Sequence, residues 1–443
     1  MNRSKEKIKA QIKNEFHGSP DLVDQKLEAY GNVCELCYIS SVSDSEKIQR
    51  DLYIPFFELR HKEGYENHLL SLAGIRQVEE KDQPEELLLR GSVLIFFNNL
   101  ILRLDVKGFV NKSIPDTSIE TTIQGPQTGL SEDLETNLNI IRHRYHQSSL
   151  TIEDRVVGNK SQSGLKLLYD AKVVDGEVLK ELYERLSEID KDVIQSVSQL
   201  SRLITSHKSF LFPTIVITER PDRISDNLSK GKVIVIMEGT RFALVLPSVF
   251  YDFMSSMDDL YLPSWVAKFL VILRYLGLGT ALLLPAIYVG ITAFNPELFR
   301  VQLALSIAGS RMSVPYPAYM EVLFMLIMME LLTEASIRLP KAIGPTATTV
   351  GGLILGQAAT EAGLVSNIMI IIVSAVAISN FVIPINEMGF AMRVTKYLLL
   401  AVATLSGLIG VIIGLIGIIY YLVSLNSFGR PYLAFFNGEQ SKK

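Results

Sequence analysis

Long apolar runs without charge are concentrated in the C-terminal part of the chain. The four uncharged stretches are 275–296, 342–360, 362–386 and 397–429. A helix that spans a bilayer needs about 20 mostly apolar residues, so the first, third and fourth of these stretches predict membrane spans. The second is rich in Gly, Ala and Thr, which allow close backbone approach. We expect it to be either a tightly packed span or a re-entrant helix.

A fifth apolar segment, 319–339, is apolar enough to insert yet carries Glu321, Glu330, Glu334 and Arg338. Glu334 and Arg338 are four residues apart on the predicted helix, so they are expected to form an ion pair. Ionisable groups in a membrane normally face a bundle interior or a water-filled path. Both readings therefore stay open: carboxylates that pair with arginines to fix helix packing, or carboxylates that line a conduit.

The pairing alternative has three candidate cations, and the conduit alternative has a geometric requirement. Arg274, Arg311 and Arg338 are the arginines that could hold the carboxylates. Glu321 is expected on a different face from Glu330 and Glu334. A single helix cannot enclose a pore, so a conduit also requires several copies of the chain around one axis.

Alternating and β-rich patterns dominate the first part of the chain. Two β-hairpins are predicted from Gly91 (GSVLIFFNNLILRLDV) and Gly231 (GKVIVIMEGTRFALVLP). A strand-then-helix pattern precedes each, with Asp44 and Asp175 as expected N-caps. This repetition predicts two related cytoplasmic α/β subdomains with mixed sheets and hairpins, followed by an all-α polytopic membrane domain. The expected ranges are 1–29 for a polar N-terminal segment, 30–150 and 151–265 for the subdomains, 266–425 for the membrane domain and 426–443 for a tail.

Charge separates the two halves. Lys and Arg number 43 and Asp and Glu 47, a net charge of −4, but only 14 of these charges lie in 266–425 and 72 lie in the first 265 residues. A wholly soluble protein is therefore excluded, and no basic run indicates a nucleic acid partner. The polar amino terminus lacks the apolar core of a signal peptide, so the first half is expected in the cytoplasm. Positive charges between the spans favour an external C-terminus, whereas Arg430, Lys442 and Lys443 favour a cytoplasmic one.

Chemistry-bearing motifs are weak. Cys34 and Cys37 lie in a strand-like run without a second cysteine pair, and core packing is the preferred reading. GGLILG at 351–356 lacks the Lys that follows a phosphate loop. We therefore expect no enzyme activity, no cofactor and no metal site.

Several strings together resemble the A subunits of the GerA family of bacterial spore germinant receptors. They include FPTIVITERPDRISDNLSKGKVIVIMEGTRFALVLPSVF from Phe212, MMELLTEASIRLPKAIGPTATTVGGLILGQAATEAGLVS from Met328, and SFGRPYLAFF from Ser427. Two departures occur: Gln127-Thr128 replaces the usual charged pair after Gly125-Pro126, and Phe435 stands where the family usually has proline. The family-motif positions, expected to be structural or to contact partners, are Gly125, Pro126, Glu132, Asp133, Asn137, Arg142, Glu219, Arg220, Pro221, Asp222, Gln357 and Glu361.

The resemblance implies a subunit of a nutrient-sensing complex in the spore inner membrane. It implies a transporter-like B subunit and a C lipoprotein as partners, a homo-oligomer that is plausibly a pentamer, and release of cations when nutrient binds. Several copies of helix 319–339 would then surround a pore. The candidate pore and gate residues are Glu321, Met325, Met328, Glu330 and Leu332. Three alternatives remain: the related subunit that amplifies ion release, a monomeric transporter with a broken helix near Gly344–Gly356, and a scaffold that only organises partners.

Overall fold

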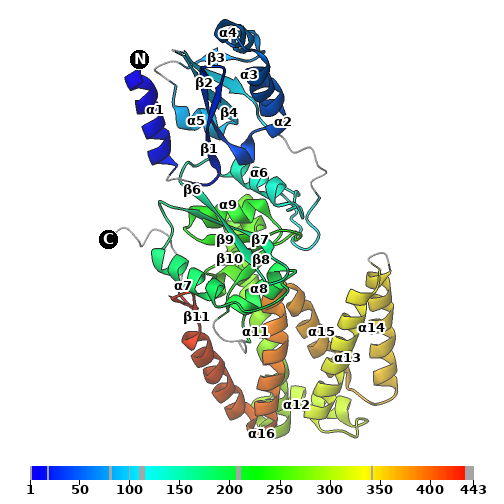
Figure 1. The fold of residues 1–443 in the computed structure, drawn as a ribbon. Helices are drawn as coiled ribbons and strands as arrows, with labels where there is room; N and C mark the ends of the chain where they lie inside the picture. The colour runs from blue at the N-terminus through cyan, green and yellow to red at the C-terminus, as the bar shows by residue number, and fades with distance from the viewer. Residues whose placement is uncertain are drawn as a thin grey trace.

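Three parts follow one another along the molecule in Figure 1: a first sheet domain, a second sheet domain and a helical region. The computed structural model describes residues 2–16, 19–78, 82–98, 100–108, 115–205, 211–340 and 343–434. The expectation for Lys442 and Lys443 lies outside the described residues.

The first sheet domain is a five-stranded sheet in the order β1-β2-β4-β5-β3. Its strands are β1 (Leu22–Ala29), β2 (Asn32–Ile39), β3 (Arg76–Gln77), β4 (Ser92–Phe97) and β5 (Leu100–Asp105). Its helices are α1 (Asn2–Glu15), η1 (Ser40–Val42), α2 (Ser45–Ile48), η2 (Gln49–Tyr53), α3 (Ile54–Glu58), α4 (Lys62–Ser71) and α5 (Pro84–Leu89). The sheet begins at Leu22, inside the segment expected to be a polar extension, because β1 pairs along its whole length with β2.

The second sheet domain repeats this order as β6-β7-β9-β10-β8. Its strands are β6 (Leu150–Val157), β7 (Ser163–Asp170), β8 (Val216–Thr218), β9 (Val233–Met237) and β10 (Ala243–Leu246). Its helices are α6 (Leu134–Arg144), α7 (Gly176–Ser187), α8 (Val197–Ile204), α9 (Pro221–Ser229) and η3 (Phe250–Met254). In each domain the strands lie side by side in the order first, second, fourth, fifth, third. The two domains therefore share one topology.

The predicted hairpins and caps are present in both domains. β4 pairs with β5 and β9 pairs with β10, and Asp44 and Asp175 each accept a backbone N–H as N-caps. We expected mixed sheets, yet every strand pair among the described residues runs antiparallel. In each domain the fourth strand starts at the edge of the sheet where the second strand ends. The second and fourth strands are neighbours, so they run antiparallel.

The helical region begins at Asp258. Its helices are α10 (Asp258–Tyr261), α11 (Ser264–Phe294), η4 (Pro296–Leu298), α12 (Val301–Arg311), α13 (Ala318–Arg338), α14 (Gly344–Glu361), α15 (Asn367–Phe381) and α16 (Asn386–Ser424). Within the described residues, α11 and α16 are long and apolar enough to cross a membrane, and α15 is a shorter apolar helix. Within the ambiguous run 342–360, the residues from Gly344 onward belong to α14, which lies beside α13 (Figure 1).

α16 is a hairpin of two arms, whereas the run 397–429 predicted one continuous span. Gly407 has φ 62° and ψ −142°, which breaks the helix, and a Cβ there would lie 2.7 Å from the Phe294 ring. A Cβ on Gly410 would clash with the carbonyl oxygen of Val402, and one on Gly414 would clash with Leu399. Figure 1 shows the two arms running in opposite directions. Glycines therefore allow both the turn and the close contact of the arms.

Beyond α16, the C-terminal segment returns to the second sheet domain. The hydroxyl of Ser427 donates to the carbonyl of Thr214 at 2.8 Å, and that of Tyr432 donates to the carbonyl of Pro213 at 2.7 Å. Phe428 is buried among the side chains of α7, α8 and β9. Residues 425–434 thus lie on the same side of the helical region as the sheet domains.

A buried ion pair joins the two sheet domains. The guanidinium of Arg142 on α6 donates to Asp21, just before β1, at 2.9 and 3.3 Å. Asp21 also accepts the hydroxyls of Ser40 and Ser41 and the backbone N–H of Ser41. Burial acts to raise the pKa of Asp21, but Arg142 and the two serines outweigh it and the pKa lies below its usual value. The charged form therefore stabilises the contact between the domains.

We predict that Asp21→Asn destabilises this contact by about 3–5 kcal/mol, because Arg142 would stay buried without its counter-charge. Hydrogen exchange of residues 19–41 and 139–150 in the intact chain measures the effect. Since the folded pKa is depressed, the stabilisation is present above about pH 4 and is lost as pH falls through the folded pKa. Asp24→Asn is the control, because Asp24 is exposed and pairs with Lys9 on the surface. Equal protection in the two variants would contradict the prediction.

Candidate functional site

The segment 115–129 is held against the second sheet domain by Glu219, the first residue of the sequence Glu-Arg-Pro-Asp. The backbone N–H groups of Ser118, Ile119 and Glu120 donate to one carboxylate oxygen of Glu219, at 2.6, 2.5 and 3.0 Å. Glu219 is 1% exposed. Three converging N–H donors satisfy the buried charge and fix the path of the loop.

Arg220, the second residue of the sequence, ties the same loop at other points. Its guanidinium donates to the carbonyl oxygens of Glu120 at 2.9 Å and Pro126 at 3.1 Å, and to both carboxylate oxygens of Asp222 at 3.0 and 2.6 Å. Pro221 begins α9, where its missing N–H costs nothing. The planar, multiply donating guanidinium is suited to this role, and a lysine could not reproduce it.

Tyr261 connects this cluster to the helical region. Its hydroxyl donates to Asp222 at 2.8 Å, and a Cβ on Gly125 (φ 135°) would lie 2.7 Å from its ring. Tyr261 ends α10, three residues before α11 starts. Burial acts to raise the pKa of Asp222, but the hydrogen bonds from Arg220 and Tyr261 outweigh it and the pKa is lowered. We name Glu219, Arg220, Asp222 and Tyr261, with the loop 118–126 that they hold, the junction cluster.

Three further family-motif positions, Glu132, Asp133 and Asn137, make contacts that stabilise the fold. Asp133 caps α6 by accepting the N–H of Thr136, and Asn137 exchanges two hydrogen bonds of 2.7 Å with the backbone of Ser131. The backbone carbonyl of Glu132 accepts the N–H of Gly239 at 3.0 Å. Together these contacts fix the entry into α6, from which Arg142 reaches the first sheet domain.

Glu321 lies in the first turn of α13 and is fully enclosed. Arg311 of α12 lies 3.3 Å from one of its carboxylate oxygens, and the N–H and hydroxyl of Ser366 each donate to the other at 2.6 Å. Ser366 is also the N-cap of α15. Glu321 thus holds three helices together, as in the pairing alternative, and the position of its carboxylate does not support a lining role in this structure.

Glu330 is paired to a different helix. Lys396 on α16 lies 3.0 Å from it and Arg393 lies 3.6 Å from it. Lys396 is buried and the Glu330 side chain is 27% exposed, so α13 and α16 share a partly buried ion pair. Arg274, an expected partner of these carboxylates, instead pairs with Asp259 at 2.5 and 2.8 Å because α11 begins beside α10.

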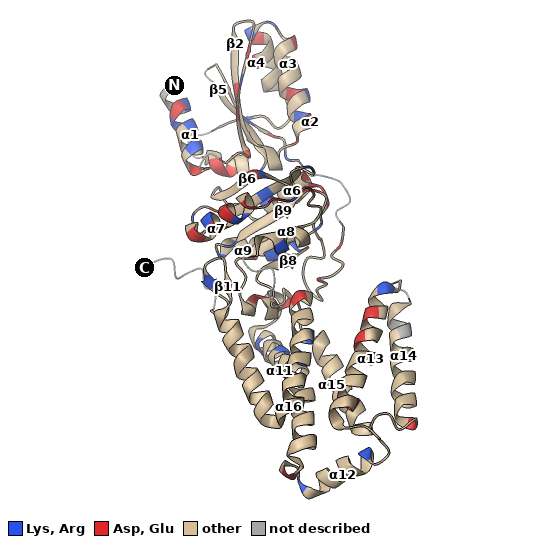
Figure 2. Ribbon diagram, turned by 60° about the horizontal axis from the view of Figure 1, so that its bottom comes forward, with Lys and Arg blue, Asp and Glu red and all other residues tan. Residues whose placement is uncertain are grey.

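Glu334 and Arg338 form the expected i,i+4 pair at 2.6 Å, and both side chains are exposed. Gln357 and Glu361 of α14 are exposed as well. Figure 2 shows the charges of α13 near the end of the helix that joins α14. These four side chains are therefore available to solvent or to a partner chain.

The candidate gate residues do not share one open face. Met325 is buried against α11 and α15, Met328 is half-buried, and Leu332 packs against Gly351 and Gly352 of α14. A different stripe of α13 is exposed, at spacings of three and four residues: Leu323, Ile327, Leu331, Glu334 and Arg338. The arrangement follows from packing, because α11, α14 and α15 cover the other sides of α13.

Sequence reasoning missed Tyr261, Asp259, Asp21 and Lys396 as site residues. Tyr261 and Asp259 stand at the end of the charge-rich first 265 residues, directly before the expected membrane domain, and this position was the available signal. The sequence around Asp21 gave no such signal, because its partner Arg142 is 121 residues away.

The two cysteines are core residues, as predicted. Both are free and buried in β2, and they pack on opposite faces of the sheet. Burial raises the pKa of each thiol to about 12, which keeps it protonated and inert. Within the part of the chain that the structure describes, no group of three or more His, Cys, Asp or Glu side chains could hold a metal ion.

Comparison with known proteins places the chain in one family. The family model described as Bacillus/Clostridium GerA spore germination protein matches residues 10–443. Spore germination protein KA of Bacillus subtilis (strain 168) is 33% identical over 436 residues, covering 96% of this chain and 80% of that protein. Spore germination protein GerLA of Bacillus cereus is 32% identical over 438 residues, covering 96% of this chain and 88% of that protein.

A solved structure also matches part of the chain. It is the N-terminal domain of the A subunit of the Bacillus megaterium spore germinant receptor GerK3, with a TM-score of 0.40 and 22% identity, and the match covers 54% of this chain and 93% of that one. The family match spans both sheet domains and the helical region together. The chain belongs to the GerA family of spore germination proteins.

Proposed function

We propose that this chain is the A subunit of a nutrient-responsive receptor in the spore inner membrane, and that several copies form a ligand-gated cation channel. A transporter-like B subunit and a lipoprotein C subunit complete the receptor. The names of the relatives, which are spore germination proteins, support a role in germination. The exposed stripe of α13 is the observation that carries the channel role.

In this proposal the helical region crosses the membrane six times, with α11, α13, α14, α15 and the two arms of α16 as spans. Both sheet domains and residues 425–434 then lie on the cytoplasmic side, the spore core, as an even number of crossings requires. Lys268, Arg338 and Arg393 are near that side, in agreement with the positive-inside tendency. α12 lies at the opposite end of the bundle (Figure 2).

The exposed stripe of α13 suits a pore that several copies build around an axis. Leu323, Ile327 and Leu331 are 40%, 42% and 58% exposed within one chain. A ring of such side chains can close a pore by excluding water, and the carboxylates of Glu334 at its mouth favour cations. Glu321 and Glu330 support the stripe from behind, because their ion pairs fix α13 against α12, α15 and α16.

The junction cluster has a matching role. It connects the loop 118–126 of the sheet domains to Tyr261, directly before α11, so a shift of the sheet domains reaches the membrane helices there. In the proposal, nutrient binding by a partner subunit moves the sheet domains, and this contact transmits the movement.

We predict that replacing Ile327 and Leu331 together by alanine makes spores lose ions without nutrient, because smaller side chains weaken the hydrophobic closure. Ion release from dormant spores measures the effect, and a severalfold rise over wild type is expected. Ile371→Ala is the control, since Ile371 is equally apolar and 69% exposed but lies on α15. Unchanged ion retention in the double variant, with normal protein levels, would rule out this stripe as the gate.

We also predict that Arg220→Gln frees the loop 118–126 and uncouples nutrient from germination. Removing the buried guanidinium takes away the counter-charge of Asp222 and the donor to the carbonyl oxygens of Glu120 and Pro126, a cost of about 3–5 kcal/mol. Faster hydrogen exchange of residues 118–126 in the purified chain and a slower germination response are the expected results. Arg144→Gln is the matched control, because the exposed Arg144 donates to Thr128, in the same segment 115–129 but outside the loop 118–126. Equal exchange in the two variants would contradict a coupling role for Arg220.

A further inference from the structure

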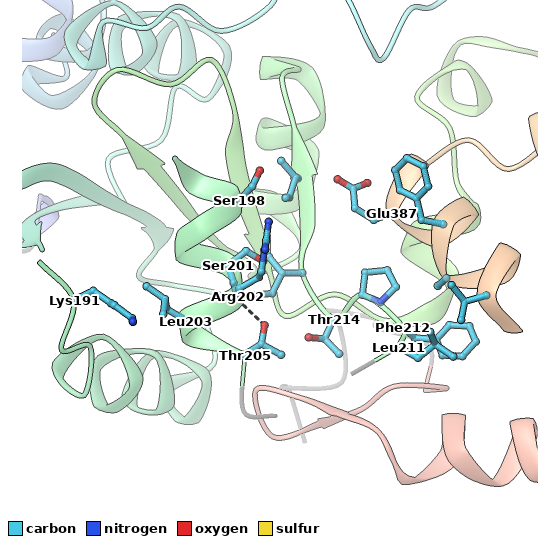
Figure 3. A pocket seen from close by; sticks show the side chains of 16 residues that line it. Lys191, Ser198, Ser201, Arg202, Leu203, Thr205, Leu211, Phe212, Thr214 and Glu387 are labelled. Carbon is cyan, nitrogen blue, oxygen red and sulfur yellow. Dashed lines mark hydrogen bonds between the residues drawn. The ribbon is translucent and has the colours of Figure 1, made fainter. Parts of the chain in front are cut away.

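A cavity of about 740 Å³ lies where the second sheet domain meets the first arm of α16. The wall from α8 presents Arg202 with the hydroxyls of Ser198 and Ser201, and the wall from α16 presents Glu387, Phe390 and Val394. Figure 3 shows Arg202 projecting into the cavity, with Glu387 on the other side. This space therefore combines hydroxyl and charged groups on one wall with apolar side chains on the helix that leads into the membrane.

A second cavity, of about 400 Å³, continues from the first between the two arms of α16. Leu211 and Phe212 line both cavities, so the two meet at these residues. The lower cavity is almost entirely apolar; Leu398 and Val402 line it from one arm, and Gly414 and Gly417 from the other. The stretch from Thr395 to Val402 gives it a length of about 10 Å along the helix.

The charges in the upper cavity are unbalanced. Lys191 also lines it, and among the described residues neither Lys191 nor Arg202 has an ion-pair partner. Among the described lining residues Glu387 is the one carboxylate, so positively charged groups are in excess. A headgroup with a net negative charge offsets this excess, whereas a zwitterionic headgroup has no net charge to do so. Basic pockets at the cytoplasmic ends of membrane helices bind anionic headgroups on this principle.

We propose that these two cavities form one binding site for an anionic phospholipid with a singly charged phosphodiester headgroup. The phosphate binds Arg202 and Lys191, the hydroxyls of Ser198 and Ser201 contact the rest of the headgroup, and one acyl chain enters the groove between the arms of α16. The bound lipid would link the second sheet domain to the last membrane hairpin. This proposal rests on the part of the proposed function that places α16 in the bilayer. It does not require that the chain form a pore.

Native mass spectrometry of the intact chain in detergent tests the site, with dioleoyl phosphatidylglycerol as the probe. One lipid per chain is expected to bind more tightly than dioleoyl phosphatidylcholine, which has the same acyl chains. Glycerol 3-phosphate, which carries the phosphate without acyl chains, is expected to bind far more weakly. Arg202→Gln should weaken phosphatidylglycerol binding by roughly tenfold, since a hydrogen bond to a charged group is lost. Arg202→Lys should restore part of it.

The groove is tested separately by Gly417→Leu. A Cβ on Gly417 would meet nothing within 4 Å, so the larger side chain enters the open groove without straining the hairpin. Phosphatidylglycerol binding should fall because the acyl chain is excluded. Gly279→Leu is the matched control, because Gly279 on α11 has the same open surroundings and lies outside the groove. Arg90→Gln, on the exposed surface of the first sheet domain, is the control for charge.

Three results would overturn the site: equal binding of phosphatidylcholine, equal binding of glycerol 3-phosphate, or phosphatidylglycerol binding that neither Arg202→Gln nor Gly417→Leu reduces relative to its control. Lipid binding is measured without ion flux, so a failure of the channel proposal would leave this result unaffected. Conversely, if no lipid binds at this site, the ion-release test of the α13 gate variants is unaffected.

Discussion

The buried guanidinium of Arg220 is the contact on which the relation between the two halves of the molecule depends. It joins a loop from between the sheet domains, the start of α9 and, through Asp222, the tyrosine that precedes α11. A buried cation is tolerated only when its donors are satisfied, so these three segments must meet together or not at all. The same requirement explains why Glu219, which has no direct bond to Tyr261, stands beside Arg220: it fixes the loop whose carbonyl oxygens Arg220 needs.

A second attachment lies at the other end of the helical region. The last arm of α16 runs into residues 425–434, which pack on the second sheet domain through Phe428 and Tyr432. The second sheet domain therefore holds both the first and the last long apolar helix, α11 and α16, whereas α13 and α14 lie at the edge of the bundle (Figure 1). A movement of this domain would act on the bundle at two points, and the helices between them are the ones free to respond.

Local patterns predicted the local structure well. The hairpins from Gly91 and Gly231, the N-caps Asp44 and Asp175, the buried cysteines and the i,i+4 pair of Glu334 with Arg338 each depend on residues close in sequence, and each is present in the structure. The turn at Gly407 escaped prediction because an apolar run gives no sign of where it reverses. The partners of Glu321 and Glu330 escaped it too, because Ser366 and Lys396 lie 45 and 66 residues away and only packing brings them together.

The distribution of charge within the helical region now separates structural from functional candidates. A carboxylate enclosed by Arg311 and Ser366, as Glu321 is, cannot turn toward a pore without leaving a buried arginine unpaired, a change that costs several kcal/mol. Glu334 and Arg338 pay no such penalty, because both are exposed and their mutual pair contributes little in water. In the channel proposal, the groups that could exchange partners during gating therefore lie on the outer stripe of α13. The pairs of Glu321 and Glu330 would hold α13 in place behind that stripe.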